Sequence, residues 1–425
     1  MTSTLITMNV RTRPTARRLV VAAVLALAVA PVGAQVALKG AKVHTMTSAG
    51  TITDGVVVIT DGKIAAVGKA SEITIPSGYA VIEGAVVTPG LIDPHGTVGV
   101  SGILNQKQDQ DQLERSSPIQ PELRAIDAYN PADRLVEWVR SFGITTVHTG
   151  HAPGELISGQ TCIVKTTGRP VDECVVVPVA TVAATLGPWS EKGGAAAPGS
   201  RAKQVAMLRE ELLRTQEYAK KRETPPAANE KDDEKSPPDR NLRSEMMLRV
   251  LKGEVPLLIT ANRAQDINSA LRLAKEFDIR IILNSAAEAY LLTAEIKAAG
   301  VPVILHAGMA RASGDMENAS RETAATLVRA GIPVAVESGY ESYVPKTRVV
   351  LFEAAQAAAH GLTFDQALAT ITTTPAKILG IDGRVGSLAV GLDGDAAVYD
   401  GDPFEYTTHC TGVVIDGRRV SDTVR

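Results

Sequence analysis

The middle of the chain alternates between two patterns of hydrophobic and polar residues. Short apolar runs at residues 257–259, 279–283, 301–305 and 332–336 are each followed by a longer stretch in which apolar residues recur every three or four positions. The runs have the length of buried strands, and the longer stretches have the period of amphipathic helices. We therefore predict an α/β fold in which parallel strands alternate with helices.

The two ends of the chain have the shorter period of strands. Residues 56–59 and 64–68 flank the pair Asp61-Gly62, and apolar residues flank Asp416-Gly417 in the same way. An Asp-Gly pair between two apolar runs predicts a hairpin with a tight turn. Because chain termini often lie close together, both ends are expected to form one small domain.

These patterns predict the organisation of the whole chain. A TIM-like (β/α)8 barrel needs about 250 residues, which the middle of the chain provides. We predict this barrel at residues 89–380, and a small β-sandwich built from residues 35–88 and 381–425. Residues 223–240 combine prolines with many charges and are expected to be a flexible insertion in the barrel.

Two helices can be predicted in more detail. Residues 201–222 carry Leu208 and Leu212 on one side and dense charge on the other, which predicts a surface helix. Thr363 and Gln366 have the spacing of a capping box, so a later helix is expected to begin there.

The composition narrows the classes of function. Hydrophobic residues make up 44% of the chain and charged residues 21%, so a large core can be buried. A net charge of -3 and an aromatic content of 4% argue against a nucleic-acid partner. Cys162, Cys174 and Cys410 are too few for a disulfide framework. They are expected to be isolated core residues, with a Cys162–Cys174 bridge as the alternative.

Residues 1–34 have the layout of a cleaved signal peptide. Arginines at positions 11 to 18 precede an apolar run at 19–30, and small residues at 32–34 follow it. The run is shorter than the ~20 residues that span a bilayer. We expect cleavage before Gln35, a secreted or periplasmic location, and no membrane attachment after cleavage.

Residues 87–99 connect the chain to a known family. A Pro-Gly turn leads into a strand that ends at His95, which resembles the first barrel strand of the amidohydrolase superfamily. The order of further segments resembles its imidazolonepropionase/prolidase-like branch, and these segments are residues 121–131, 143–147, 159–165 and 374–380. The resemblance implies a barrel with a small β-sandwich, and hydrolysis of amide or cyclic amide C–N bonds with a divalent metal.

The chain departs from the family at the positions that the resemblance assigns to metal ligands. These positions hold Thr97, Thr260, Asn262, Ser285 and Gly339. Zinc in catalytic sites is held by imidazole, thiolate or carboxylate groups, which these residues lack. We therefore expect a degraded metal site with no cofactor and with weak or no metal-dependent catalysis. Such a protein would bind a small amide or peptide, or act as the partner of an active paralogous subunit.

The alternative is an active enzyme with one divalent metal, such as zinc, at relocated ligands. His95, His151 and His306 follow predicted strands, whose carboxyl ends meet at one end of a barrel. His148, Glu155 and Glu337 are expected near the same place. Separately, the resemblance implies a carboxylated lysine that bridges two metals, and Lys165 is the candidate for that role. The sequence leaves both hypotheses open.

Overall fold

A computed structural model describes residues 35–104, 106–193, 198–223, 239–306, 308–340 and 349–424. The described residues all belong to one compact unit. The predicted signal peptide and most of the predicted insertion at 223–240 lie outside the described residues. Among the described helices, none combines the length and the hydrophobicity that a bilayer crossing requires.

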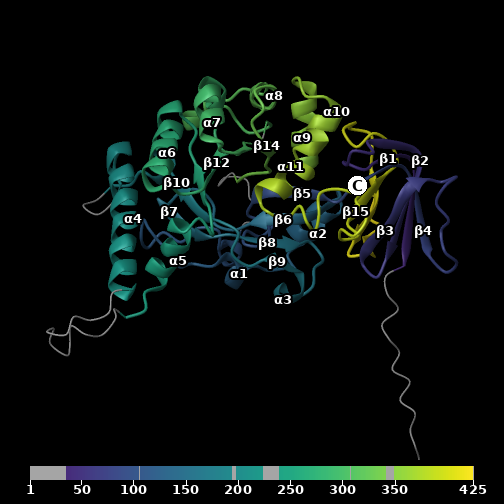
Figure 1. Cartoon of the computed structure of the whole chain (residues 1–425), viewed down its shortest axis with the longest axis horizontal. Coiled ribbons are helices and arrows are strands. Elements are labelled where there is room, and N and C mark those ends of the chain that lie inside the picture. Colours follow the sequence, from purple (N-terminus) through teal and green to yellow (C-terminus); the bar gives the residue numbers. More distant parts are fainter. Residues whose placement is uncertain are drawn as a thin grey trace, which may run out of the picture. The chain divides into compact units, whose positions relative to one another are not determined.

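Strands from both ends of the chain form one seven-stranded sheet, in the order β17-β16-β15-β4-β1-β2-β3 (Figure 1). The strands are β1 Val36–His44, β2 Thr51–Thr60, β3 Lys63–Lys69, β4 Ala80–Pro89, β15 Ala396–Tyr399, β16 Cys410–Ile415 and β17 Arg418–Ser421. β4 pairs with β15 in antiparallel fashion, so the predicted association of the two ends is confirmed. The sheet has an apolar cluster of its own, which includes Leu38, Val57 and Val398.

Both predicted Asp-Gly hairpins are present. β2 and β3 pair on either side of Asp61 and Gly62, whose φ angles are 50° and 79°. Asp416 and Gly417 connect β16 to β17 with φ angles of 49° and 71°. Two successive residues with positive φ match the right-handed twist of the paired strands, and Asp-Gly tolerates this conformation well.

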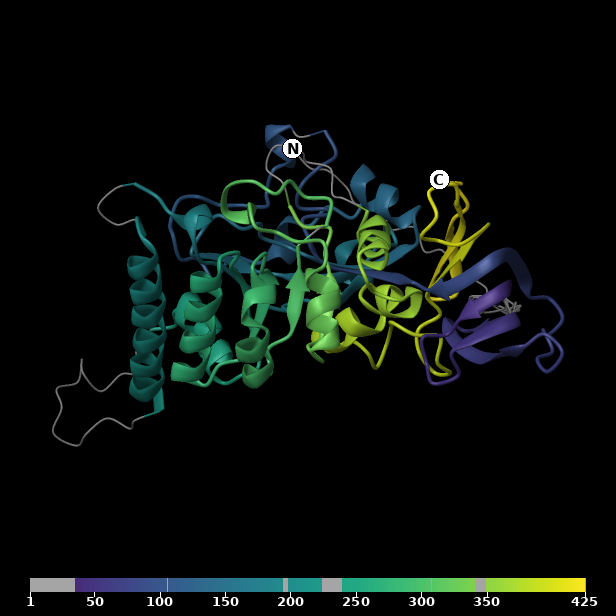
Figure 2. The same cartoon turned by 90° about the horizontal axis from the view of Figure 1, so that it is seen from above.

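Strands and helices alternate in the second half of the chain, as the hydrophobic pattern predicts. The parallel strands are β10 Val182–Thr185, β11 Leu257–Thr260, β12 Ile281–Ser285, β13 Val303–Leu305 and β14 Val334–Val336. The helices that follow β11 to β14 are α6 Ala264–Phe277, α7 Thr293–Ala299, α8 Thr323–Arg329 and α9 Val350–Ala359. In the view of Figure 2, the helices from α4 onward stand side by side, coloured from teal to yellow-green.

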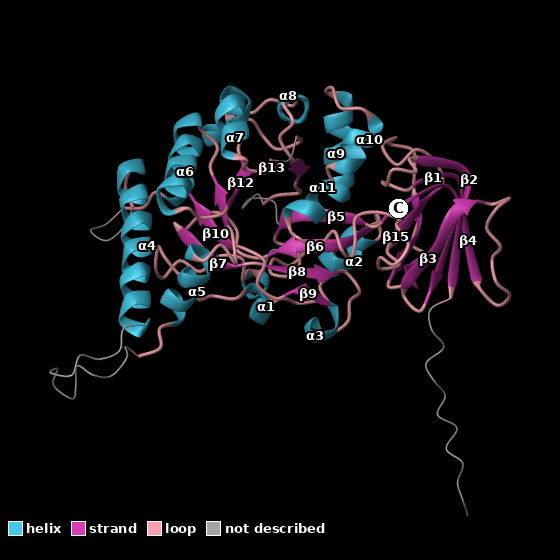
Figure 3. Ribbon diagram, in the orientation of Figure 1, coloured by secondary structure: helices cyan, strands magenta, loops and turns pink. Residues whose placement is uncertain are grey.

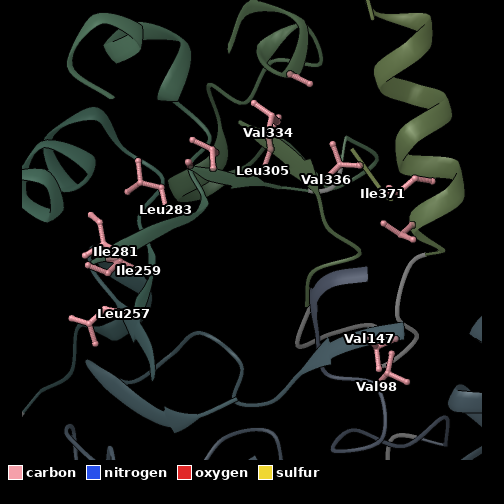
Figure 4. Close-up of a cluster of buried hydrophobic side chains, with 14 of the residues drawn as sticks. Val98, Val147, Leu257, Ile259, Ile281, Leu283, Leu305, Val334, Val336 and Ile371 are labelled. Carbon is pink, nitrogen blue, oxygen red and sulfur yellow. The ribbon is translucent and has the colours of Figure 1, made fainter. Parts of the chain in front are cut away.

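These parallel strands are apolar throughout because both of their faces are buried. Leu257, Ile259, Ile281 and Leu283 project from one face, where Figure 4 shows them in the main apolar cluster. The residues between them form a smaller cluster on the other face, together with Ile378; they are Leu258, Ile282, Ile304 and Ala335. A parallel sheet covered on both faces has this continuous apolar sequence.

The first half of the α/β part does not alternate in this way. β5 Leu91–Gly96 and β6 Ile144–Thr149 are parallel, but β8 Cys162–Lys165 runs antiparallel to β6. β9 Val175–Val177 continues this second sheet, while β7 Ile157–Gln160 pairs antiparallel with β10. A backbone bridge between Gly96 and Gly339 brings the end of β5 beside the end of β14. The strands therefore fall into a six-stranded and a four-stranded sheet, and full closure as a (β/α)8 barrel stays a prediction.

The remaining helices lie beside the sheets or beside other helices (Figure 3). They are α1 Ala125–Ala128, α2 Arg134–Arg140, α3 Val171–Cys174, α4 Arg201–Glu223, α5 Leu242–Leu251, α10 Phe364–Ala369 and α11 Thr373–Ile378. The predicted capping box is confirmed, since Thr363 and Gln366 hydrogen-bond each other's backbone at the start of α10. α4 buries not only Leu208 and Leu212 but also Glu211, which forms an ion pair with Arg243. All three cysteines are buried and free, so the Cys162–Cys174 bridge is absent.

Lys165 at the end of β8 ties the α/β part to the end sheet. Its Nζ lies 2.7 Å from Asp393 Oδ2 and 3.1 Å from Asp395 Oδ1, and it also contacts Asp416. Burial alone would lower the pKa of Lys165, but the neighbouring carboxylates outweigh burial and raise it. This ammonium group is therefore a structural cation, and the interpretation of Lys165 as a metal-bridging lysine was wrong.

Replacing Lys165 by Met should strongly destabilise the fold, because the aspartates would lose their buried counter-charge. Removing one partner of a buried ion pair costs about 3–5 kcal/mol. Lys39→Met is the matched control, since Lys39 pairs with Glu83 on the surface, where such a pair contributes about 0–1 kcal/mol. Urea unfolding of both variants measures the difference; equal losses would contradict the role given to Lys165.

Candidate functional site

A cavity of about 560 Å³ opens at the carboxyl ends of the parallel strands. Its floor consists of residues that directly follow or end β5, β12, β13 and β14, and these are His95, Asn284, Ser285, His306, Glu337, Ser338 and Gly339. This is the end of the strands at which α/β barrels carry their sites. The cavity is therefore the candidate functional site.

His95 and Glu337 form a buried pair on this floor. His95 Nδ1 lies 3.1 Å from Glu337 Oε2, and each residue is 3% exposed. Burial lowers the pKa of His95 to about 4 and raises the pKa of Glu337 well above its ordinary value. Both shifts favour the uncharged forms of the two side chains.

Asp93 and Ser338 form a second buried pair between the same two strands. The Ser338 backbone N–H donates to Asp93 Oδ1 over 3.2 Å, and the Ser338 hydroxyl donates to Oδ2. Burial raises the pKa of Asp93 to about 7, although these hydrogen bonds act in the opposite direction. Asp93 and His95 are two residues apart on one strand, so their side chains share a face. A Cβ on Gly96 would lie 2.9 Å from the Ser338 oxygen, which explains the glycine.

His148 lies beside His95, with 5.7 Å between the ring centroids, but both of its nitrogens are already used. Nδ1 donates to the carbonyl of Pro94 over 2.5 Å, and Nε2 accepts a hydrogen bond from the Thr161 hydroxyl over 2.6 Å. Burial lowers the pKa of His148 to about 3. This neutral histidine supports the strand that carries His95.

The structure does not bring the three predicted relocated ligands together. His95 and His306 both line the cavity, whereas His151 does not. The ring of His151 packs against Gly159 of β7, where an added Cβ would lie 2.5 Å from Nε2. Burial lowers the pKa of His151 to about 4.

Two of the five substituted ligand positions line the cavity, namely Ser285 and Gly339. The expectation that all five do so needs correction, because Thr97, Thr260 and Asn262 lie outside the lining. Thr260 accepts a hydrogen bond of 3.0 Å from the side-chain amide of Asn284, which itself lines the cavity. The Asn262 side chain instead accepts from the backbone of Ala287 over 3.4 Å.

The cavity also contains residues that sequence reasoning missed. Asn284 and Ser338 belong to the floor, and Asp93 lies directly behind Ser338. The position of Asp93 two residues before His95 was the one feature of the sequence that could have indicated its place near the site. The wall and rim residues come from loops, and these are Arg115, Pro153, Gly154, Trp189, Ala310, Arg311, Ser313, Gly314, Asp315, Met316 and Tyr340.

Arg263 anchors the loop after β13 that forms part of this wall. Its guanidinium donates to the carbonyl of Gly314 over 2.9 Å and to Glu317 over 2.7 Å. The same guanidinium also donates to Glu288 over 3.0 Å. Because Arg263 directly precedes α6, its bonds to Gly314 and Glu317 hold the loop to the start of that helix. These bonds fix the position of Asp315 and Met316 in the cavity wall.

Of the residue types that hold zinc in catalytic sites, the floor of the cavity contains His95, His306 and Glu337. His95 is suited to be one ligand, because its Nε2 is buried without a hydrogen-bond partner while its Nδ1 lies 3.1 Å from Glu337 Oε2. Across the described ranges, however, no three His, Cys, Asp or Glu side chains are grouped so that they could hold a metal ion. Asn284, Ser285 and Ser338 do not replace imidazole, thiolate or carboxylate ligands.

Known proteins resemble this chain in sequence and in fold. Residues 255–421 match the model of the Amidohydrolase family. Over 399 residues the chain is 26% identical to the amidohydrolase tasK of Hapsidospora irregularis, an alignment that covers 85% of this chain and 39% of that protein. The chain thus spans about two fifths of the length of this curated relative.

Solved structures extend the similarity to nearly the whole chain. An amidohydrolase from Thermotoga maritima MSB8 superposes with a TM-score of 0.82 at 25% identity, over 91% of this chain and 100% of that one. A putative prolidase from Bifidobacterium longum gives 0.57 at 19% identity, over 92% and 95%. An adenosine deaminase from Xanthomonas campestris with bound zinc gives 0.52 at 15% identity, over 92% and 93%.

The fold and its cavity define an α/β protein whose site lies at the carboxyl ends of parallel strands. More particularly, residues 255–421 are similar in sequence to the Amidohydrolase family, and nearly the whole chain is similar in fold to a solved amidohydrolase. Its structural neighbours include prolidase-like proteins.

Asp93→Asn should change the pH dependence of stability. The pKa of Asp93 is about 7 in the folded chain and about 3.9 in the unfolded chain, so its stabilising effect is complete below pH 4 and is lost as the pH rises towards 7. The expected loss is at most about 4 kcal/mol, since one pKa unit corresponds to about 1.4 kcal/mol. Asparagine keeps the shape without the charge.

Unfolding free energies at pH 4, 5, 6 and 7 test this prediction. The difference between Asp93→Asn and the unaltered chain should move in favour of the variant across this range. Asp127→Asn, at an exposed position on α1, is the control and should show a constant difference. A constant difference for Asp93→Asn as well would show that Asp93 ionises normally in the folded state.

Proposed function

We propose that this chain binds a small amide or peptide in the cavity and has lost most or all of the metal-dependent hydrolysis of C–N bonds that its superfamily implies. The observation that carries the proposal is the floor of the cavity. It offers hydrogen-bonding groups, the His95–Glu337 pair among them, and the part of the chain that the structure describes contains no group of three His, Cys, Asp or Glu side chains that could hold a metal ion. An amide needs both a donor and an acceptor partner, and this floor supplies both kinds.

A second function is favoured by one observation. His95 presents a buried Nε2 without a hydrogen-bond partner, and Glu337 orients the ring from behind. Metal-bound histidines are usually oriented in this way. The alternative is therefore an active hydrolase with one divalent metal at His95 and at a second group that lines the cavity, such as His306. We place it second because a catalytic zinc site needs about three protein ligands.

The placement in the prolidase-like branch and the closed barrel belong to the same proposal. The order of the family segments along the chain supports the branch, and the bridge between Gly96 and Gly339 supports closure on one side. A small amide or a dipeptide is the ligand class that this branch suggests.

Ala310→Trp should abolish ligand binding, because Ala310 lines the cavity and an indole there would fill the entrance. Ala312→Trp is the matched control, since Ala312 is exposed and lies outside the lining. Binding is measured by calorimetry with a panel of dipeptides and N-acyl amino acids, and hydrolysis by release of the amine. Saturable binding without turnover, lost only in Ala310→Trp, is expected; metal-dependent turnover of the bound compound would contradict the proposal.

We also propose that residues 1–34 direct export of the chain. The support is the order of basic, apolar and small residues in the sequence. When the full chain is produced in a bacterial host, fractionation should place it in the periplasm, and mass spectrometry should show a mature N-terminus at Gln35. An uncleaved chain in the cytoplasm would contradict this assignment.

A further inference from the structure

The register of β12 brings Asn284 to the floor of the cavity. Successive side chains of a strand point to opposite faces. Leu283 belongs to the main apolar cluster and Ile282 to the smaller cluster on the other face, so Asn284 continues the face of Ile282. There it lines the cavity and is 1% exposed. A polar side chain thus ends this apolar face of the strand.

The Asn284 side chain has a fixed orientation and one unused acceptor. Its Nδ2 donates to Thr260 Oγ1 over 3.0 Å. It also lies beside His95 and Glu337, because it opposes the pKa shifts that burial causes in both. Its Oδ1 is buried and, among the described residues, has no hydrogen-bond partner of ordinary geometry. A buried acceptor without a partner costs free energy, and an N–H group of a bound ligand would remove that cost.

The backbone after Asn284 turns the next side chain towards the same cavity. The alternation of the strand would place Ser285 on the face of Leu283, yet Ser285 lines the cavity. Its φ angle is 66° and that of Ala286 is 50°, in the left-handed region that residues other than glycine seldom adopt. The Ala286 N–H donates to the Asn284 carbonyl over 2.8 Å and closes this turn. Two such residues in succession are backbone strain, which concentrates at ligand sites.

The turn leaves the Ser285 hydroxyl available as a donor. It makes no hydrogen bond with any residue that the structure describes. The other hydroxyl of the floor is already used, since Ser338 donates to Asp93. Two adjacent residues of β12 therefore present one free acceptor and one free donor at the cavity.

We propose that Asn284 determines which amides the cavity binds: its Oδ1 accepts a hydrogen bond from the amide N–H, while Ser285 donates to an oxygen of the same ligand. Primary and secondary amides bind, and tertiary amides, which have no hydrogen on nitrogen, are excluded. A tertiary amide would leave Oδ1 unpaired, and a site built to pair with an N–H rejects analogues that lack it. This inference rests on the proposed function, since it divides the amides into those that bind and those that do not.

The test compares N-acetyl-L-phenylalanine with N-acetyl-N-methyl-L-phenylalanine, which differ by one methyl group on the amide nitrogen. Both are titrated into the unaltered chain by calorimetry. The secondary amide should bind at least about tenfold more tightly, because the tertiary amide leaves a buried acceptor unpaired.

Asn284→Leu separates the hydrogen bond from simple exclusion of the methyl group, because leucine keeps the volume and removes the acceptor. The preference should fall to within about threefold, through lost affinity for the secondary amide. Asn268→Leu is the matched control, since Asn268 lies on α6 outside the lining, and it should keep the preference. Ser285→Ala should weaken both probes alike, by about threefold or more, and should also keep the preference.

The outcomes distinguish this inference from the proposed function. If the tertiary amide binds as tightly as the secondary one, or if Asn284→Leu keeps the full preference, the role of Asn284 is overturned while amide binding stands. If neither probe binds, the proposed function fails and the inference fails with it. Should circular dichroism show that Asn284→Leu is unfolded, Asn284→Ala takes its place, and a full preference retained there would contradict the role of Asn284 equally.

Discussion

Two buried hydrogen-bonded pairs between β5 and β14 hold the candidate site together. Asp93 binds Ser338 and His95 binds Glu337, so the strand at the start of the α/β part is fixed to the strand at its end. The Gly339 backbone reinforces the contact by donating to the His95 carbonyl over 3.2 Å. All four side chains are 2–3% exposed, and an unsatisfied polar group at this depth would cost about 1–3 kcal/mol. The cavity floor depends on these contacts.

The same burial determines the chemistry of the floor. Desolvation shifts the pKa values of His95, Glu337 and Asp93 towards their uncharged forms. A divalent metal requires several lone-pair-bearing groups, such as neutral imidazole and deprotonated carboxylate, that converge on one point. Neutral, mutually paired groups are instead suited to hydrogen-bond a neutral polar ligand. This contrast underlies the proposal of binding without the superfamily's metal chemistry.

Much of the fold could be predicted from local sequence patterns, and much of the site could not. The hairpins at Asp61 and Asp416 and the alternation of strands and helices after residue 257 depend on neighbouring residues, which the sequence displays. The structure of residues 150–181 was harder to predict from the sequence. Their antiparallel pairing with β6 and β10 joins distant segments and leaves no helical period. His95 carried a family signal, whereas the direction of His151 depends on the space that Gly159 leaves. Likewise the structural role of Lys165 depends on aspartates that lie more than 220 residues away in the sequence.

The metal content of the purified protein tests the central claim most directly. The full chain would be produced in medium supplemented with zinc and manganese, and elemental analysis would follow extensive dialysis without a chelator. A floor of neutral paired groups predicts far less than one ion per chain, unchanged in His95→Ala. One tightly held ion per chain, lost in His95→Ala, would contradict the account and establish the enzyme with a relocated metal site.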